Sequence, residues 1–240
     1  MQVTDYDLTL IDPTTRSPEL EAWTRAVAVG FLQQDLSPEQ LDQQISSIMA
    51  DGGRVRAATT RLPEGLGALD HPVATFRSWD NTVNVGGGVL ADTNFISDVT
   101  VRQTDRRRGL LSRLMRTDLH EAKERGQSLA ALTVTEATIY SRFGFGVNTI
   151  EHRISLDLSP RFEMHNEPSG SMVQLEPFSP ETQQLWTQIY DQYHRSQRGS
   201  HGSSGQHSWA MLGLFDWEAS ARGLQMRAVA HLDEQKNVDG

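Results

Sequence analysis

The chain has 240 residues and a formal net charge of −9, from 22 Lys and Arg against 31 Asp and Glu, and it contains no cysteine. This length is enough to bury at least one full core. Without cysteine there are no disulfides, thiolate metal sites or acyl-cysteine intermediates. An acidic surface repels the phosphates of nucleic acids and favours cationic partners such as amines.

Neither a signal peptide nor a membrane span is expected. Met1–Leu10 carries polar and acidic residues where a signal peptide needs an apolar run. No stretch of the sequence approaches the roughly 20 apolar residues that cross a bilayer. We therefore expect a soluble, cytoplasmic protein without a membrane partner. The eight histidines show no metal-binding spacing, so no metal site is expected.

The first part of the chain predicts a strand, two helices and a series of short strands. Residues 6–11 alternate polar and apolar side chains, as in a half-buried strand. Ser17-Pro18-Glu19 and Ser37-Pro38-Glu39-Gln40 each place a hydroxyl cap before a proline, and Gln40 is placed to close a capping box. Further strands are expected at 55–60, 73–79, 82–90 and 95–101. Their turns are predicted at Asp80-Asn81 and at 92–94, with a bulge or bend at Gly86–Gly88.

The middle of the chain predicts a helix between strands. The helix runs from Gly109 to about Arg125, with an apolar stripe along one side and Gly126 as its stop. The apolar run 129–134 then predicts a buried strand, and 151–158 predicts another. Together with the preceding elements, this order indicates an α+β or α/β domain that ends near residue 160.

The last part of the chain has a looser pattern. Residues 165–171 are typical of a linker, a helix is expected after Ser179, and 195–206 is expected to be mobile. A strand is predicted at 224–231, followed by a turn at 237–240 that should lead to its partner. Because the chain stops at that turn, we expect a fragment of a longer protein.

The segment Val99–Met115 carries the chemistry. A strand ends near Val101, and an elbow rich in Arg and Gly opens the next helix. The first turn of a helix has unpaired N–H groups and a partial positive charge, which together bind phosphate. Gly109 lets the backbone approach an anion closely. For the arginines alone, a surface run ahead of an ordinary helix is the competing interpretation.

These motifs, in this order, resemble the acyl-CoA-binding core of the GNAT acetyltransferases. The shared features are Arg-x-x-Gly between a strand and a helix, then a strand, then Tyr-x-x-Phe-Gly-Phe. Leu111 departs from the small residue usual in the superfamily. However, Arg106-Arg-Arg-Gly-Leu-Leu111 and the segment Thr135–Gly146 are similar to the enhanced intracellular survival (Eis) family. The resemblance implies the GNAT fold, a mixed central sheet flanked by helices, over residues 1–160, and the start of a second GNAT-like domain over 161–240.

The resemblance also implies roles for individual residues. Val101 would donate its N–H to the thioester oxygen, and Tyr140 would protonate the departing thiolate as general acid. Tyr140 could instead be an aromatic core residue beside Phe143 and Phe145. The residues implied to bind acetyl-CoA are Val99, Thr100, Val101, Arg107, Arg108, Gly109, Leu110, Leu111, Ser112, Thr135 and Glu136.

The predicted function is direct transfer of acetyl from acetyl-CoA to primary amines of a polycationic acceptor, aminoglycoside-like or protein lysine. Resemblance also implies a homo-oligomer, a hexamer. No general base is assigned, because the Eis family uses a C-terminal carboxylate of a third domain that this sequence lacks; water or Glu136 could substitute. Two alternatives stay open: a non-catalytic acyl-CoA-binding regulatory module, and nucleic-acid binding through Arg106–Arg108, which the net charge disfavours.

Overall fold

The computed structural model describes residues 6–60, 70–134, 137–150, 155, 157, 159, 169–204 and 227–240. Among these residues, no helix is both long and apolar enough to cross a membrane. The elements in chain order are β1 (Asp7–Ile11), α1 (Pro18–Gly30), α2 (Pro38–Asp51), β2 (Arg54–Thr59), β3 (Ala74–Gly86), β4 (Val89–Val101), the 3-10 helix η2 (Gln103–Asp105), α3 (Leu110–Glu124), β5 (Leu129–Leu132), the 3-10 helices η3 (Ala137–Ile139) and η4 (Ser141–Phe143), β6 (Ser171–Leu175), α4 (Pro180–Ser196) and β7 (Ala228–Leu232).

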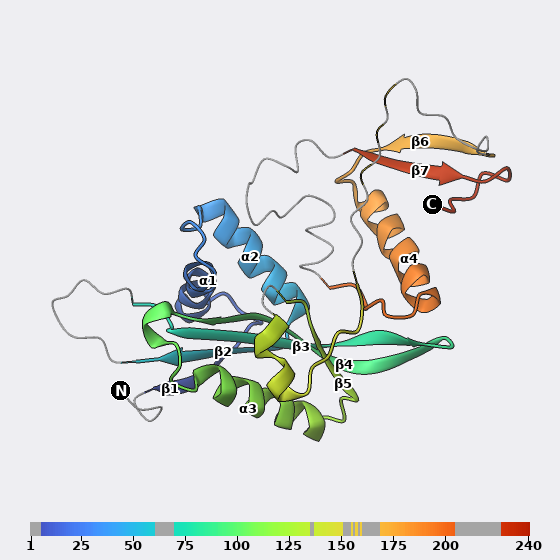
Figure 1. Ribbon diagram of the computed structural model, residues 1–240. Helices are drawn as coiled ribbons and strands as arrows, with labels where there is room; N and C mark the ends of the chain where they lie inside the picture. Colours follow the sequence, from blue (N-terminus) through green and yellow to red (C-terminus); the bar gives the residue numbers. More distant parts are fainter. Residues whose placement is uncertain are drawn as a thin grey trace.

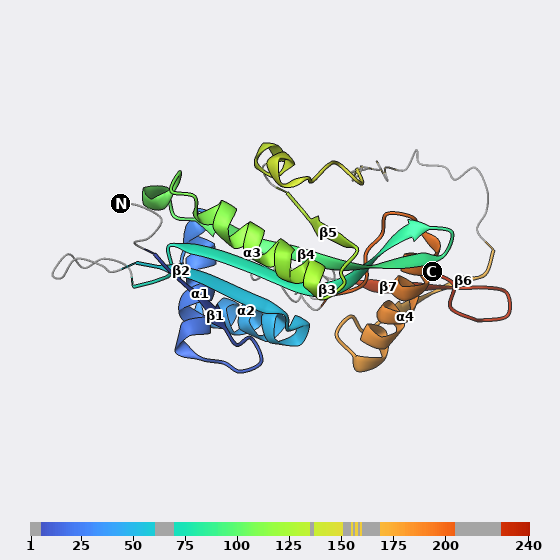
Figure 2. The same cartoon turned by 90° about the horizontal axis from the view of Figure 1, so that it is seen from below.

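A mixed sheet with helices on both faces forms the main body, as expected from the sequence. Its strand order is β1-β2-β3-β4-β5, antiparallel except for the parallel pair β4–β5. Helices α1 and α2 cover one face and α3 covers the other (Figure 1), and the view from below shows α3 lying along β3 and β4 (Figure 2). Leu110, Leu114 and Met115 of α3 are buried in one core cluster, and Leu20 and Trp23 of α1 are buried in the other.

Three helices begin where the sequence predicts, for the same local reason. Ser17, Ser37 and Ser179 each accept a hydrogen bond from a backbone N–H in the first turn, and a proline follows each cap. In α2 the Gln40 side chain closes the capping box. Each first turn also carries a glutamate, whose charge suits the positive end of the helix dipole.

The strand meander differs from the prediction. Instead of turns at Asp80-Asn81 and 92–94, β3 and β4 are continuous strands of 13 residues each, and Asp80 pairs with Asn94. These polar residues stay in the strands because tertiary partners satisfy them: Arg54 Nη2 donates to Asp80 Oδ1 at 2.7 Å and to Asn94 Oδ1 at 3.1 Å. The chain turns instead at Gly87 and Gly88, whose φ angles of 61° and 76° suit a hairpin turn.

Two other strand predictions need correction. Residues 129–132 form β5 as predicted, but the strand is not fully buried, since Leu129 is 42% exposed. Strand β7 pairs with β6, which begins at Ser171 inside the expected linker, and not with a strand after the turn at 237–240. Val238 instead bridges back to Leu232. Most of the expected strand at 151–158 lies outside the described residues.

The segment after α4 is held against the sheet, where the sequence favoured a mobile stretch. The Gly199 N–H donates to the Asn84 carbonyl at 2.7 Å, and the Asn84 N–H donates to the Ser200 carbonyl at 3.0 Å. His201 forms a bridge opposite Val83 of β3. The described residues of this segment therefore extend along the free edge of the β3 end that projects toward α4 (Figure 1). The division of the chain near residue 160 stays a prediction.

Candidate active site

The central feature of the site is a fork between two parallel strands. Strands β4 and β5 pair from Thr93 opposite Leu129 to Ile96 opposite Leu132, and β4 then continues to Val101 without this neighbour. The strands separate there and leave an open cleft of about 810 Å³, the first cleft. Its described lining includes the end of α1, β4 from Ile96 to Val101, the start of α3, and Tyr140.

A bulge in β4 lies at this fork. Thr100 pairs with Thr75 of β3 and Ser97 pairs with Arg77, so β4 has one residue more than β3 between these pairs. Asp98 occupies the bulge with a φ of 54°. Ile96 and Val99 both pack in the core cluster on the α3 face, although an unbroken strand would place residues three apart on opposite faces.

The bulged end of β4 directs backbone N–H groups into the fork. The Arg102 N–H donates to the Val73 carbonyl beside β3 at 2.7 Å. Successive N–H groups of a strand point to alternate edges, so the N–H groups of Val101 and Val99 point to the opposite edge, away from β3. That edge is the one that β5 has left. Two backbone donors therefore face the first cleft.

The N-terminus of α3 differs from those of the other α-helices described. Its N-cap is Gly109, with a φ of 78°, no side-chain cap and no acidic residue in the first turn. The first backbone bond at this end is from Arg113 N–H to the Gly109 carbonyl, and no described residue accepts a hydrogen bond from the N–H groups of Gly109–Ser112. Open amides at the positive end of a helix dipole form an anion site.

The three arginines of the elbow divide into two groups. Arg106 and Arg107 line the first cleft. Arg108 turns away: its Nη1 donates to the Tyr6 Oη at 2.9 Å and its Nη2 donates to the Thr104 carbonyl at 3.1 Å. Two arginines of the run therefore line the cleft, where Arg106 Nε donates to the Val101 carbonyl at 3.4 Å, and the side chain of Arg108 contacts Tyr6 and the Thr104 carbonyl instead.

Tyr6 and Asp105 complete this support, and the sequence offered no signal for either. The Tyr6 phenol donates to Asp105 Oδ1 at 2.7 Å, and Thr104 donates to the other carboxylate oxygen at 2.6 Å. Burial, followed by the hydrogen bond to Asp105, raises the pKa of the Tyr6 phenol, which keeps it a donor at neutral pH. Through Tyr6, the side of the domain that carries β1 therefore holds the loop that leads into α3.

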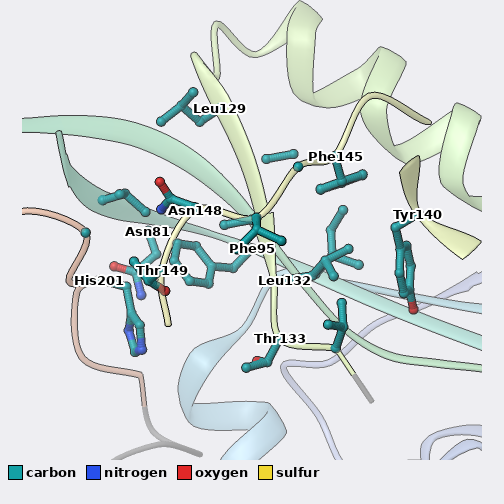
Figure 3. Close-up of a pocket in the computed structure, with 18 of the residues that line it drawn as sticks. Asn81, Phe95, Leu129, Leu132, Thr133, Tyr140, Phe145, Asn148, Thr149 and His201 are labelled. Carbon is teal, nitrogen blue, oxygen red and sulfur yellow. The ribbon is translucent and has the colours of Figure 1, made fainter. Parts of the chain in front are cut away.

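Tyr140 lies where two clefts meet. It is 9% exposed and stands edge-on to Phe145, with ring centroids 6.1 Å apart. A second cleft of about 1220 Å³ shares with the first cleft the residues Ile96, Ser97, Leu132, Thr133 and Tyr140. Figure 3 shows the second cleft with Tyr140 at one end and Asn81 and His201 at the other. Tyr140 is thus both a packed aromatic residue and a cleft residue.

The fold brings most of the predicted site residues to one place. Val99, Thr100, Val101, Arg107, Gly109, Leu110, Leu111, Ser112 and Tyr140 all line the first cleft. Arg108 is not among its described lining residues, and Thr135 and Glu136 lie outside the described residues. The Thr100 hydroxyl is bonded to the Thr75 hydroxyl at 2.7 Å and is buried. Its backbone is therefore the part that can contribute to the cleft.

Sequence reasoning did not assign Gly30 and Phe31, the end of α1, to this cleft, which they also line. A Cβ on Gly30 would lie 2.3 Å from the Thr100 side chain, so only glycine allows α1 to approach β4 this closely. The signal in the sequence is this glycine at the end of a helix, but nothing local indicates what it contacts.

Comparison with known proteins identifies the family. Residues 14–148, more than half of the chain, match the acetyltransferase (GNAT) domain. The chain belongs to the GNAT acetyltransferase family. Members of the GNAT family use acetyl-CoA, and an anion site beside a strand fork fits the linked phosphates of that cofactor.

Named relatives support the GNAT assignment. An uncharacterized N-acetyltransferase of Streptomyces griseus is 43% identical over 137 residues, which is 57% of this chain and 31% of the relative. The N-acetyltransferase Eis of Mycobacterium tuberculosis is 31% identical over 147 residues, 60% of this chain and 35% of the relative. The chain therefore spans about a third of the length of these relatives.

Solved structures show the same GNAT fold. A probable N-acyltransferase from Enterococcus faecalis superposes with a TM-score of 0.69 at 11% identity, covering 98% of this chain and 54% of that one. Eis1 from Mycobacterium abscessus gives a TM-score of 0.63 at 22% identity, covering 95% and 52%. At these identities the likeness concerns the fold alone. Membership of the narrower Eis family stays a prediction, as does the expectation that the chain is truncated.

Proposed function

We propose that this GNAT chain catalyses transfer of acetyl from acetyl-CoA to a primary amine. The observation that carries the proposal is the start of α3. It lacks the side-chain cap and the glutamate of α1, α2 and α4, and it opens beside the β4–β5 fork. Among the described residues, nothing accepts a hydrogen bond from the first amides of this helix and no strand pairs with the adjacent edge of β4 beyond Ile96. With two nearby arginines, this arrangement suits a long ligand that begins in phosphates and continues in amides.

Different residues of the first cleft would bind different parts of acetyl-CoA. The amides of Gly109–Ser112, with Arg106 and Arg107, would hold the pyrophosphate. The free edge of β4 at Val99–Val101 would bind the amide groups of the pantetheine arm as a neighbouring strand does. Thr135 and Glu136, which follow β5 in the chain, are proposed to line the same cofactor. The backbone of Arg108 is proposed to contribute to the cofactor site. Its side chain is proposed to hold the elbow in place.

The chemical step follows from the groups at the fork. Acetyl-CoA supplies the acetyl thioester. The Val101 N–H would donate to the carbonyl oxygen as negative charge develops on it. The amine nitrogen forms a bond to the carbonyl carbon as the C–S bond breaks. A protonated amine would lose one proton before the attack and a second after the C–N bond forms, both to solvent or a carboxylate. Tyr140 would give its proton to the leaving sulfur and regain one from solvent, so that the proton count balances.

The acceptor is proposed to enter through the second cleft, because that cleft meets the first at Tyr140. The net charge of −9 and the resemblance to the Eis family support a polycationic acceptor, aminoglycoside-like or protein lysine. The described lining of the second cleft is largely neutral, with Arg198 as its permanently charged side chain. The same proposal includes a homo-oligomer, which the resemblance implies to be a hexamer. Light scattering measures the molar mass in solution and so the number of copies.

A substrate panel tests the function. Purified full-length protein is incubated with acetyl-CoA and an aminoglycoside, a polyamine, a lysine peptide or a simple aromatic amine. Free thiol is measured, and each product is checked by mass for a gain of one acetyl group. Thiol release that depends on an amine supports the proposal. Coenzyme A binding by calorimetry with no turnover on any amine would favour the non-catalytic binding module instead.

A further inference from the structure

A buried group of three charges lies behind the bulge of β4. Arg77 of β3 is fully buried, and its Nη2 lies 2.7 Å from Asp51 Oδ2 at the end of α2. Its Nη1 lies 3.6 Å from Asp98 Oδ2 in the bulge. The side chains of Asp51 and Asp98 are only 4% and 6% exposed. Arg77 therefore connects the last residue of a helix to the residue that interrupts β4.

Asp98 occupies a backbone conformation that needs support. Its φ of 54° lies in the left-handed region, which is unfavourable for a residue with a Cβ. Two neighbours on β3 hold it there. Thr75 Oγ1 donates to the Asp98 carbonyl at 2.7 Å, and Arg77 attracts the carboxylate. Both the main chain and the side chain of the bulge are thus fixed from the neighbouring strand.

The bulge decides where the backbone of the fork points. Beyond it, Val99 returns to the α3 face and Thr100 packs against Thr75 and Gly30. If the extra residue were accommodated elsewhere in β4, the alternation of N–H groups between Ile96 and Val101 would change, and different groups would face the cleft. The orientation of the Val101 N–H is therefore tied to the conformation of Asp98.

We propose that Arg77, anchored by Asp51 and acting through Asp98, is a positioning residue for acyl transfer. It keeps the bulge in place, and the bulge aims the Val99 and Val101 N–H groups at the fork. This inference rests on the proposed function, because it concerns the donor to the thioester oxygen. Arg77 is not among the described residues that line the cleft, so its effect is exerted through the backbone of β4.

Two substitutions of Asp98 separate the backbone effect from the charge. Asp98→Ala removes the carboxylate and disfavours positive φ, whereas Asp98→Gly removes it but adopts positive φ freely. We expect Asp98→Ala to lower kcat by at least about tenfold, toward the 100-fold loss typical of a missing oxyanion donor, with KM for acetyl-CoA nearly unchanged. Asp98→Gly should retain most of kcat. Equal losses of kcat in both variants would show that the carboxylate contact with Arg77 holds the bulge whatever the preference for φ, which still supports the inference. An unchanged kcat in Asp98→Ala would overturn it.

Arg77→Lys tests the arginine itself. It keeps the positive charge but loses the two-pronged geometry that reaches both Asp51 and Asp98. We expect it to lower kcat and spare KM. Because Arg77 and Asp98 act on one bulge, the double variant Arg77→Lys/Asp98→Ala should lose little more than either single variant. Additive losses would show that Arg77 does not act through Asp98.

Asp118→Asn is the matched control for destabilisation. Asp118 of α3 is also fully buried and pairs with a buried arginine, Arg56, at 2.8 Å, but it lies between the sheet and α3 and does not line the first cleft. This variant should lower Tm and leave kcat unchanged. A kcat as low as that of Asp98→Ala would mean that loss of stability alone explains the effect, which would overturn the inference.

Backbone NMR separates the failure of this inference from the failure of the proposed function. Adding acetyl-CoA to the wild-type protein should shift the Val99 and Val101 amide signals, and Asp98→Ala should shift them differently. If wild-type protein shows no shift and no binding, the proposed function and this inference both fall. If wild-type protein binds and turns over while Asp98→Ala gives the same Val101 shift and the same kcat, only the positioning role of Arg77 falls.

Discussion

Arg108 donates a hydrogen bond of 2.9 Å to the Tyr6 phenol, across 102 positions of the sequence. The arginine belongs to the elbow before α3 and the tyrosine precedes the first strand. Asp105 Oδ1 accepts a hydrogen bond from the Tyr6 phenol at 2.7 Å, so the three side chains form one connected unit. The elbow before α3 is therefore supported by the opposite edge of the sheet.

This contact predicts that Arg108 affects cofactor binding through Tyr6. We expect Arg108→Ala to weaken coenzyme A binding by about tenfold, since a hydrogen bond to a charged group contributes about 1.5–3 kcal/mol. Tyr6→Phe, which removes the shared hydroxyl, should weaken it to a similar degree, as measured by calorimetry. If Arg108 instead bound phosphate directly, only Arg108→Ala would weaken binding, and the loss would shrink at high salt.

Gly109→Glu should abolish coenzyme A binding. The substitution places a carboxylate beside amides that would hold the pyrophosphate and forces a Cβ into a φ of 78°. Gly126→Glu is the matched control, because Gly126 has a φ of 85°, follows the other end of α3 and has open space around its Cβ position. Calorimetry should show normal affinity for the control. Unchanged affinity of Gly109→Glu would exclude the elbow as the phosphate site.

Tyr140→Phe should lower kcat by about 100-fold with little change in KM for acetyl-CoA, as expected when a general acid is lost. The ring and its packing on Phe145 remain, so Tm should stay close to that of the wild type. Tyr193→Phe, on the exposed side of α4, serves as the control. A normal kcat for Tyr140→Phe would leave Tyr140 with a packing role only.

Asp98→Asn should change how stability depends on pH. Burial raises the pKa of the Asp98 carboxyl above its ordinary value, although Arg77 opposes the shift and Asp51 adds to it. For a carboxyl with a raised folded-state pKa, the contribution to stability is present below the unfolded-state pKa and is lost as pH rises through the folded-state pKa. The amide variant does not ionise, so its stability relative to wild type should improve as pH rises.

Urea unfolding at several pH values measures this difference. The free energy of unfolding of Asp98→Asn minus that of wild type should increase from acidic to neutral pH. A difference that is constant with pH would show that the Asp98 carboxyl has the same pKa in the folded and unfolded states. A difference that decreases would show that Arg77 lowers the pKa more than burial raises it.

Elements with local causes could be located from the amino-acid sequence. A serine cap followed by proline predicts the starts of α1, α2 and α4 because the cap and the N–H groups it satisfies lie within four residues. The elbow at Gly109 could also be located, since a glycine, an arginine run and an apolar stripe adjoin in the chain. The resemblance to GNAT proteins implied roles for Val101 and Tyr140, which stay predictions.

Features that depend on distant partners became visible once the chain was folded. Asp80 and Asn94 have the composition of turns but remain in strands, because Arg54 reaches both from β2. The bulge at Asp98 depends on Thr75 and Arg77 across the sheet. Arg108 looks like its neighbours in the sequence, yet Tyr6 turns it away from the cleft. Local propensity cannot encode a contact between residues that only folding brings together.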